Sequence, residues 1–113
     1  MELINLSNDR VIAEDVNKAY NFFKRLKGLM FTKELPQGDG LHIKPCSSIH
    51  TFFMKYPIDV LYINKDNVVV AIDKALQPGK AGARYPGASA VVELSVGSVK
   101  ASETQVGHKL IFI

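Results

Sequence analysis

Cysteine is almost absent from this sequence. Cys46 is the single one among 113 residues, so no disulfide can form within the chain. Long apolar runs are absent too, and the longest fall far short of the roughly 20 residues that a helix needs to cross a bilayer. The first ten residues, MELINLSNDR, contain no apolar core of the kind that a secretory signal peptide carries. We therefore expect a cytoplasmic protein with no membrane partner.

Signatures of nucleic-acid binding are also missing. The sequence holds no RNA-recognition, zinc-finger or KH-type motif. Its net charge is +3, from 14 Lys and Arg against 11 Asp and Glu, and the basic residues are spread along the chain. The densest basic group, Lys18, Lys24, Arg25 and Lys27, falls on the exposed face and end of an expected helix. We therefore expect no nucleic-acid partner.

What the sequence does contain is typical of a globular domain. The apolar fraction is 47% and the charged fraction 22%, close to the averages of soluble proteins. Neither disorder nor a fibrous repeat fits this composition. The length predicts a single domain over residues 1–113.

Short strand-like runs dominate the chain. Two of them flank a turn at 7–9, and Asn64–Asn67 predicts a hairpin turn. The other runs cover residues 41–43, 49–54, 58–63, 68–73, 90–94 and 109–113. Many short strands separated by turns predict a mainly β fold, mostly antiparallel, with a sandwich or barrel-like arrangement.

One α-helix is predicted near the N-terminus, packed on the sheet. Asp15 is expected to cap it, and Gly28 to end it. Between them, apolar side chains recur at helical spacing. They are Val16, Ala19, Tyr20, Phe23 and Leu26.

The stretch from Leu76 to Ser89 has no periodicity and contains three glycines and two prolines. Loops of this length are uncommon in compact domains and are often functional. Lys80, Arg84 and Tyr85 lie in it, and basic side chains beside glycine backbone N–H groups favour a carboxylate or phosphate ligand.

Cys46, His50 and Met54 are soft metal ligands spaced four residues apart. Because the run from Ile49 to Met54 reads as a strand, residues four apart would lie about 13 Å from each other. Two ligands of one metal must lie within about 4–5 Å. No metal and no cofactor are therefore expected, and Cys46 is expected to be an inert, partly buried thiol.

Asp59 interrupts an apolar run and leaves two interpretations open. It accepts backbone N–H groups and fixes a turn or bulge, or it lies in a pocket near His50. The strand register decides between them, because a slip of one residue moves every side chain to the other face. Glu93, in the run VVELSVG, is interpreted as an ion-pair or rim residue.

Three segments resemble a known family: RLKGLMF, IHTFFMKYPIDVLYINKDNVVV, and VVELSVGSV with VGHKLIF. Their order and spacing resemble the bacterial and archaeal family called domain of unknown function 192, or uncharacterised protein family 0127, over about residues 11–112. The resemblance implies a mainly β fold with a helix near the N-terminus. It implies no catalytic residues, because the family has no assigned activity. Gly107-His108 stands where many relatives have Gly-Asp, the segment before Gly28 is slightly longer, and the export signal of many relatives is missing.

Three functions are weighed on these grounds. The first is a small β-domain that binds a small polar or anionic ligand in a cleft bordered by the 76–89 loop. The alternatives are a protein-interaction or scaffold domain and an enzyme with an Asp59–His50 acid–base pair. The candidate ligand-binding residues are His50, Met54, Asp59, Lys80, Arg84 and Tyr85.

Overall fold

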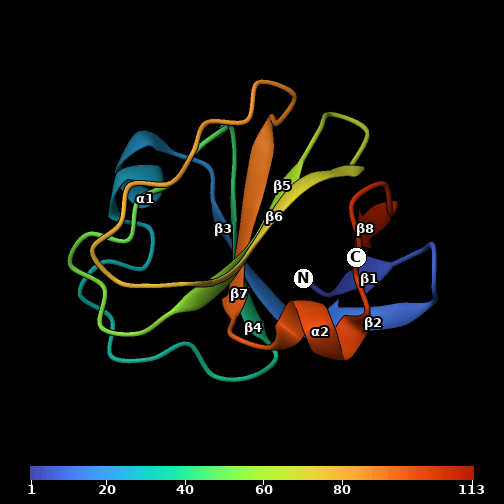
Figure 1. The fold of residues 1–113 in the computed structure, drawn as a ribbon, viewed down its shortest axis with the longest axis horizontal. Coiled ribbons are helices and arrows are strands. Elements are labelled where there is room, and N and C mark those ends of the chain that lie inside the picture. The colour runs from blue at the N-terminus through green and yellow to red at the C-terminus, as the bar shows by residue number, and fades with distance from the viewer.

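The computed structural model describes residues 1–113 and shows a mainly β protein with two short helices (Figure 1). The elements in chain order are β1 (Leu3–Asn5), β2 (Arg10–Ala13), β3 (Asp15–Ala19), α1 (Phe22–Lys27), β4 (Asp39–Ile43), β5 (Ile58–Ile63), β6 (Val69–Leu76), β7 (Ala90–Ser95), α2 (Ser98–Ser102) and β8 (Leu110–Phe112). The prediction of a mainly β, mostly antiparallel chain is confirmed. The strands form two sheets that do not close into a barrel.

The larger sheet has the strand order β3-β4-β7-β5-β6. Only the β3–β4 pair is parallel; the other neighbours are antiparallel. Every residue of β5 and β7 is buried, because both faces of the sheet are covered. Side chains of β5 alternate between two apolar clusters, with Leu61 in one and Val60 in the other.

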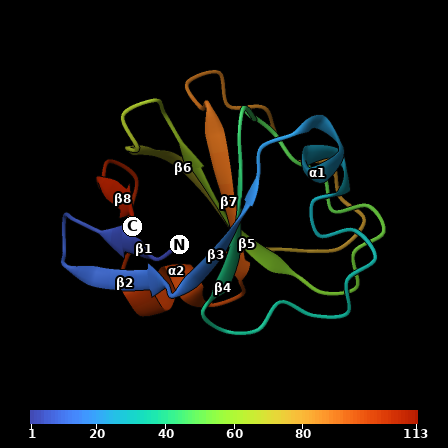
Figure 2. The same ribbon diagram turned by 180° about the vertical axis from the view of Figure 1, so that it is seen from behind.

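The smaller sheet has the order β2-β1-β8 and holds both chain ends (Figure 1). Its residues Leu3 and Leu110 pack into the same cluster as Leu61 and Val92 of the larger sheet. The view from behind places α1 and the long loops at the opposite end of the molecule from this sheet (Figure 2).

The predicted helix begins in the wrong place. Residues 15–19 form strand β3, which pairs with β4, and α1 starts only after Asn21, whose side chain accepts the N–H of Lys24. Val16 and Ala19 are both buried, which fits one face of a helix but also a strand that is covered on both faces. Val16 and Ala19 lie in different apolar clusters, and pairing with β4 makes the segment a strand. Gly28 does end the helix, as predicted. A second short helix, α2, follows β7. Neither helix combines the length and apolar character needed to cross a membrane.

The predicted strand at 49–54 is also wrong. This segment is a loop that makes only an isolated bridge, from His50 to Ala81, and turns at Phe52 and Phe53. Phe53 adopts a φ of 63°, which is incompatible with a strand. The hairpin turn at Asn64–Asn67 is confirmed, and the side chain of Asn64 accepts the N–H groups of Asp66 and Val68 within it.

Candidate functional site

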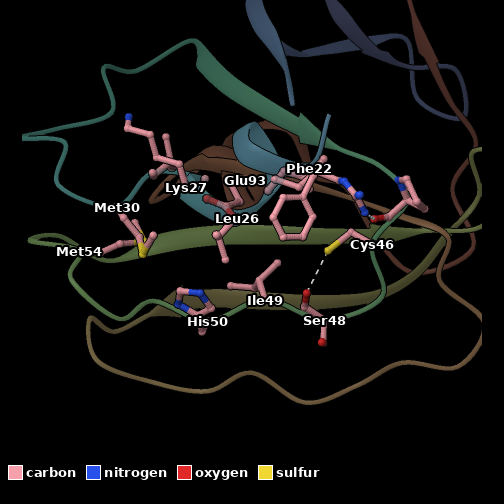
Figure 3. Close-up of a pocket in the computed structure, with 15 residues that line it drawn as sticks. Phe22, Leu26, Lys27, Met30, Cys46, Ser48, Ile49, His50, Met54 and Glu93 are labelled. Carbon is pink, nitrogen blue, oxygen red and sulfur yellow. Dashed lines mark hydrogen bonds between the residues drawn. The ribbon is translucent and has the colours of Figure 1, made fainter. Parts of the chain in front are cut away.

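A cleft of about 250 Å³ opens between α1 and the loop that follows β4 (Figure 3). Its walls come from Phe22 with residues 25–30 and from members of the stretch between Ile43 and Met54, and its base holds Glu93 of β7. Figure 3 shows Cys46 and Met54 towards opposite ends of the cleft, with Glu93 between them. Three segments distant in sequence therefore meet over one face of the larger sheet.

Glu93 is the most unusual side chain of this cleft. It lies at the centre of β7 with only 3% of its surface exposed, and its Oε2 is buried without a hydrogen-bond partner. No cation pairs with it, since the single ion pair of the structure joins Arg10 to Glu103. Buried carboxyl groups are normally hydrogen-bonded or paired, so an unpartnered one requires an explanation.

Burial sets the protonation state of Glu93. Removal from water disfavours the charged form and raises its pKa to about 8. At neutral pH the group is therefore mainly a neutral carboxylic acid. In this form it offers one O–H donor and a carbonyl acceptor to whatever enters the cleft.

Gly28 brings the backbone of the cleft wall close to this carboxyl group. It has a φ of 49°, and a Cβ at this position would lie 3.7 Å from Glu93 Oε1. Its N–H closes α1 by donating to the carbonyl of Lys24 at 2.9 Å. The glycine that ends the helix thus also forms the wall next to the buried acid.

Arg25 and Cys46 supply the other polar groups of the cleft. Arg25 donates from one terminal nitrogen to the carbonyl of Pro45 at 3.1 Å, while its Nε is buried without a partner. The Cys46 thiol donates to the carbonyl of Ser48 at 2.9 Å, and burial raises the pKa of this thiol. Cys46 is therefore a protonated thiol at neutral pH, without the lowered pKa that a nucleophile requires.

His50 and Met54, two of the predicted site residues, both line the cleft. Met54 is buried, and His50 is half-buried with its ring stacked on Phe52 at 5.0 Å. The His50 Nδ1 accepts the N–H of Phe52 at 3.3 Å. Because this segment is a loop, the spacing argument against a shared metal does not apply to it; the structure nonetheless holds no group of three His, Cys, Asp or Glu side chains that could bind one.

Lys80, Arg84 and Tyr85 do not line this cleft. The 76–89 loop instead lies behind the 49–54 segment and fastens it through Thr51, whose N–H donates to the carbonyl of Lys80 at 2.7 Å. Tyr85 packs on Tyr62 and donates to Asp73 at 3.3 Å. The loop that was expected to border a ligand cleft therefore does not line this one and supports its wall from the back.

Asp59 lies on the other face of the sheet. Its carboxylate accepts the N–H groups of Ala75 at 2.9 Å, Gly97 at 3.1 Å and Val99 at 3.0 Å. The interpretation of Asp59 as the acceptor that fixes a bulge and a turn agrees with these contacts. Asp59 shares no pocket with His50, and the hypothesis of an Asp59–His50 acid–base pair is therefore wrong.

Glu93 and Arg25 are the residues that sequence reasoning missed. Arg25 was assigned to a solvated helix face, and Glu93 to an ion pair or a rim. The signal in the sequence was a carboxylate within the apolar run Ala90–Leu94 with no basic residue beside it. The cleft that holds it is also lined by residues 25–30, which lie more than 60 positions earlier in the chain.

Comparison with known proteins gives the family and the fold. The chain belongs to the DUF192 family, described as "Uncharacterized ACR", whose model matches residues 4–112. A UPF0127 protein of Thermococcus sibiricus is 31% identical over 96% of this chain and 72% of that protein. A UPF0127 protein of Pyrococcus furiosus is also 31% identical, over 96% of this chain and 95% of that protein. The family resemblance is thus confirmed.

Two crystal structures share the fold. A protein of unknown function from Novosphingobium aromaticivorans has a TM-score of 0.83 and 21% identity, covering 98% of this chain and 82% of that one. A protein from Sinorhizobium meliloti, described as a candidate transcription regulator, has a TM-score of 0.83 and 23% identity, covering 97% and 89%. At these identities the likeness concerns the fold alone.

Proposed function

We propose that this member of the DUF192 family is a binding domain for a small organic ligand with an apolar body and a carboxylate or similar acceptor group. The observation that carries this proposal is the buried, unpartnered carboxyl group of Glu93 at the base of the cleft. A ligand that accepts a hydrogen bond from the Glu93 O–H would give this carboxyl group the partner that it otherwise lacks.

The polar groups of the cleft favour an acceptor rather than a donor. The neutral Glu93 donates through its O–H, and Arg25 has an unpartnered Nε–H and a permanent positive charge. A ligand carboxylate between them would receive hydrogen bonds from both residues. This agrees with the anionic ligand expected from sequence, although the basic group is Arg25 rather than Lys80 or Arg84.

The walls and the size limit the rest of the ligand. Apolar side chains from three segments line the cleft, among them Leu26, Met30, Ile43, Ile49 and Met54. Pockets for drug-sized ligands usually measure roughly 300–1,000 Å³, and this cleft is smaller. A short aliphatic or a single-ring carboxylate matches this volume.

The proposal is tested by NMR titration of the ¹⁵N-labelled chain with straight-chain carboxylates of increasing length, benzoate, and alcohols of the same shapes. We expect the carboxylates to shift the amide signals of Gly28 and Cys46 and the alcohols to bind more weakly. Binding should weaken about tenfold between pH 7 and pH 9, since Glu93 loses its proton near pH 8 and then repels the ligand.

Two variants and a control separate the role of Glu93 from general effects. Glu93→Gln keeps a donor without titrating, so it should bind at pH 7 and lose the pH dependence. Glu93→Leu removes the polar contact and should weaken binding at pH 7. Glu14→Gln, an exposed carboxylate elsewhere, is the matched control. Unshifted Gly28 and Cys46 signals with every carboxylate, or wild-type binding by Glu93→Leu, would refute the proposal.

A further inference from the structure

Five exposed phenylalanine side chains belong to the two segments that frame the cleft, residues 22–31 and 50–54, and we refer to them as the aromatic rim. They are Phe22, Phe23, Phe31, Phe52 and Phe53. Their exposed fractions run from 44% for Phe52 to 78% for Phe23. Single exposed apolar residues are ordinary in soluble proteins, but a contiguous group marks an interaction site.

Ring contacts join four of the rim phenylalanines in two pairs, and the fifth contacts a residue of the cleft wall. Phe31 stacks on Phe53 with ring centres 5.4 Å apart, and Phe22 meets Phe23 edge-on at 5.4 Å. Phe52 stacks on His50, which lines the cleft, as does Phe22. Phe31 and Phe53 each adjoin in sequence a methionine of the cleft wall.

The backbone holds two of these rings in a strained conformation. Phe31 has a φ of 66° and Phe53 a φ of 63°, values that bulky side chains rarely adopt. The N–H of Phe31 donates to the carbonyl of Phe53 at 3.1 Å and joins the two turns. Strain of this kind costs stability and is concentrated at functional sites, so it is a second sign of function here.

The charges around the rim are mainly positive, and the nearby carboxyl groups are Glu34, next to Lys33, and Glu93 inside the cleft. Residues 21–33 and 50–55, which carry all five phenylalanines, also contain Lys24, Arg25, Lys27, Lys33 and Lys55 and no Asp or Glu. The partner of this surface therefore carries negative charge and accepts apolar rings.

We propose that the aromatic rim docks on an anionic lipid surface, with the phenylalanines inserted among the headgroups and the lysines above them. Aromatic and aliphatic side chains that insert beside lysines are the usual basis of peripheral membrane binding. This needs no spanning segment, so the absence of one does not bear on it. The inference does not depend on the identity of the ligand in the cleft.

Single-stranded nucleic acid fits the rim less well. Bases stack on free aromatic faces, whereas Phe31, Phe53 and Phe52 already have one face covered by another ring. The apolar cleft at the centre of the rim also suits acyl chains better than nucleotides. A second copy of the chain is the remaining alternative, and the test separates it.

The absence of tryptophan from the chain provides a specific probe. The full chain with Phe53→Trp is mixed with vesicles of phosphatidylcholine containing about 30% phosphatidylglycerol, and with vesicles of phosphatidylcholine alone. We expect its emission to shift to the blue and to be quenched by brominated acyl chains with the anionic vesicles only. Val106→Trp, 60% exposed and outside the rim, is the control and should not shift.

Sedimentation with the same vesicles measures the contributions of the rim. Phe31→Ser combined with Phe53→Ser should bind at least about tenfold more weakly, whereas Val106→Ser with Ile113→Ser should bind like the wild type. Lys24→Gln combined with Lys27→Gln removes two positive charges without touching the strained turns and should weaken binding to the anionic vesicles. About 0.5 M salt should weaken binding of the wild type for the same electrostatic reason.

Four outcomes would overturn the inference. The first is that the wild type does not bind anionic vesicles, and the second is that the two tryptophan variants show equal emission shifts. The third is that the phenylalanine pair and the control pair lose equal affinity for the vesicles. The fourth is that the chain does not bind vesicles but binds a thymidine oligonucleotide or associates with itself.

Discussion

The carboxylate of Asp59, in the central strand β5, accepts the N–H of Val99, in the first turn of α2, at 3.0 Å. The N-cap of α2 is Gly97, which has no side chain to satisfy the free N–H groups of the helix. Asp59 takes over this task from a distance of 40 residues in sequence and also accepts the N–H of Ala75 in β6, a residue with a φ of 51°. One carboxylate thus ties three elements together.

Replacement of Asp59 by alanine should lower the free energy of unfolding by about 3–5 kcal/mol. The substitution leaves buried N–H groups without an acceptor, and each such loss costs about 1–3 kcal/mol. Urea denaturation measures the change. Asp66→Ala, an exposed aspartate in the β5–β6 turn, should change stability by less than about 0.5 kcal/mol. Equal effects of the two substitutions would contradict this role for Asp59.

Glu93 should make the protein less stable as the pH rises. Its pKa is raised to about 8 in the folded chain, so the folded state keeps a proton that the unfolded state releases above its ordinary pKa of 4.5. The stabilisation is complete below that value and is lost as the pH rises through about 8, at up to about 1.4 kcal/mol per pH unit. Denaturation midpoints measured at several pH values should therefore fall more steeply for the wild type than for Glu93→Gln. Parallel curves would show that Glu93 does not titrate as inferred.

His42 should make the protein less stable as the pH falls, whereas Glu93 makes it less stable as the pH rises. Its Nδ1 is 2.7 Å from the Tyr20 hydroxyl, its ring stacks on Phe112 at 4.1 Å, and its Nε2 is buried without a partner. Burial, with help from Lys44, lowers its pKa to about 4 from 6.5.

The contribution of His42 to stability should therefore fall as the pH drops from about 6.5 to about 4, because only the unfolded chain binds a proton on His42 in this range. Between pH 4.5 and 6.5 the effects of Glu93 and His42 partly cancel in the wild type. Thermal unfolding of His42→Phe between pH 4 and 7 isolates the histidine. Relative to the wild type, this variant should gain stability as the pH drops through this range, and an unchanged difference between the two would rule His42 out as the responsible group.

Gly82 and Gly87, both in the 76–89 loop, should respond differently to alanine. A Cβ on Gly82 would lie 2.8 Å from the carbonyl oxygen of Ile49, whereas nothing lies within 4 Å of one on Gly87. We expect Gly82→Ala to destabilise the protein by about 1–3 kcal/mol, since backbone must move, and Gly87→Ala to be neutral or slightly stabilising. Urea denaturation of the two variants compares them directly, and a tolerated Gly82→Ala would show that the loop does not pack on the 49–54 segment as described.

The sequence predicts the central strands well and the loops poorly, for a physical reason. The runs 58–63 and 90–94 are apolar because both faces of the sheet are covered, so their composition reports the structure directly. The run 49–54 is equally rich in β-branched and aromatic residues, but Phe52 and Phe53 are exposed there. Composition cannot distinguish a buried strand from an apolar loop that serves a surface.

Sequence reasoning could predict only some of the residues of the candidate site. His50 and Met54 were selected from a local pattern and do line the cleft. Glu93 and Arg25 both line the cleft because distant parts of the chain come together there, and no local pattern records this arrangement. Asp59 drew attention as a carboxylate in an apolar run, yet Glu93 had the same signature, and only the backbone N–H groups around Asp59 separate the two.

The hydrogen bonds of Thr51 couple the local opening of the 49–54 segment to that of the 76–89 loop. Its side chain donates to the carbonyl of Gln77 at 2.6 Å and accepts the N–H of Lys80 at 2.8 Å, while its carbonyl accepts the N–H of Gly79 at 2.8 Å. The 49–54 segment and the glycine-rich loop behind it cannot separate without breaking all of these bonds. We therefore expect the amides of both segments to exchange with deuterium in a single cooperative event. Opening of a loop that does not line the cleft would then set how often the cleft wall opens.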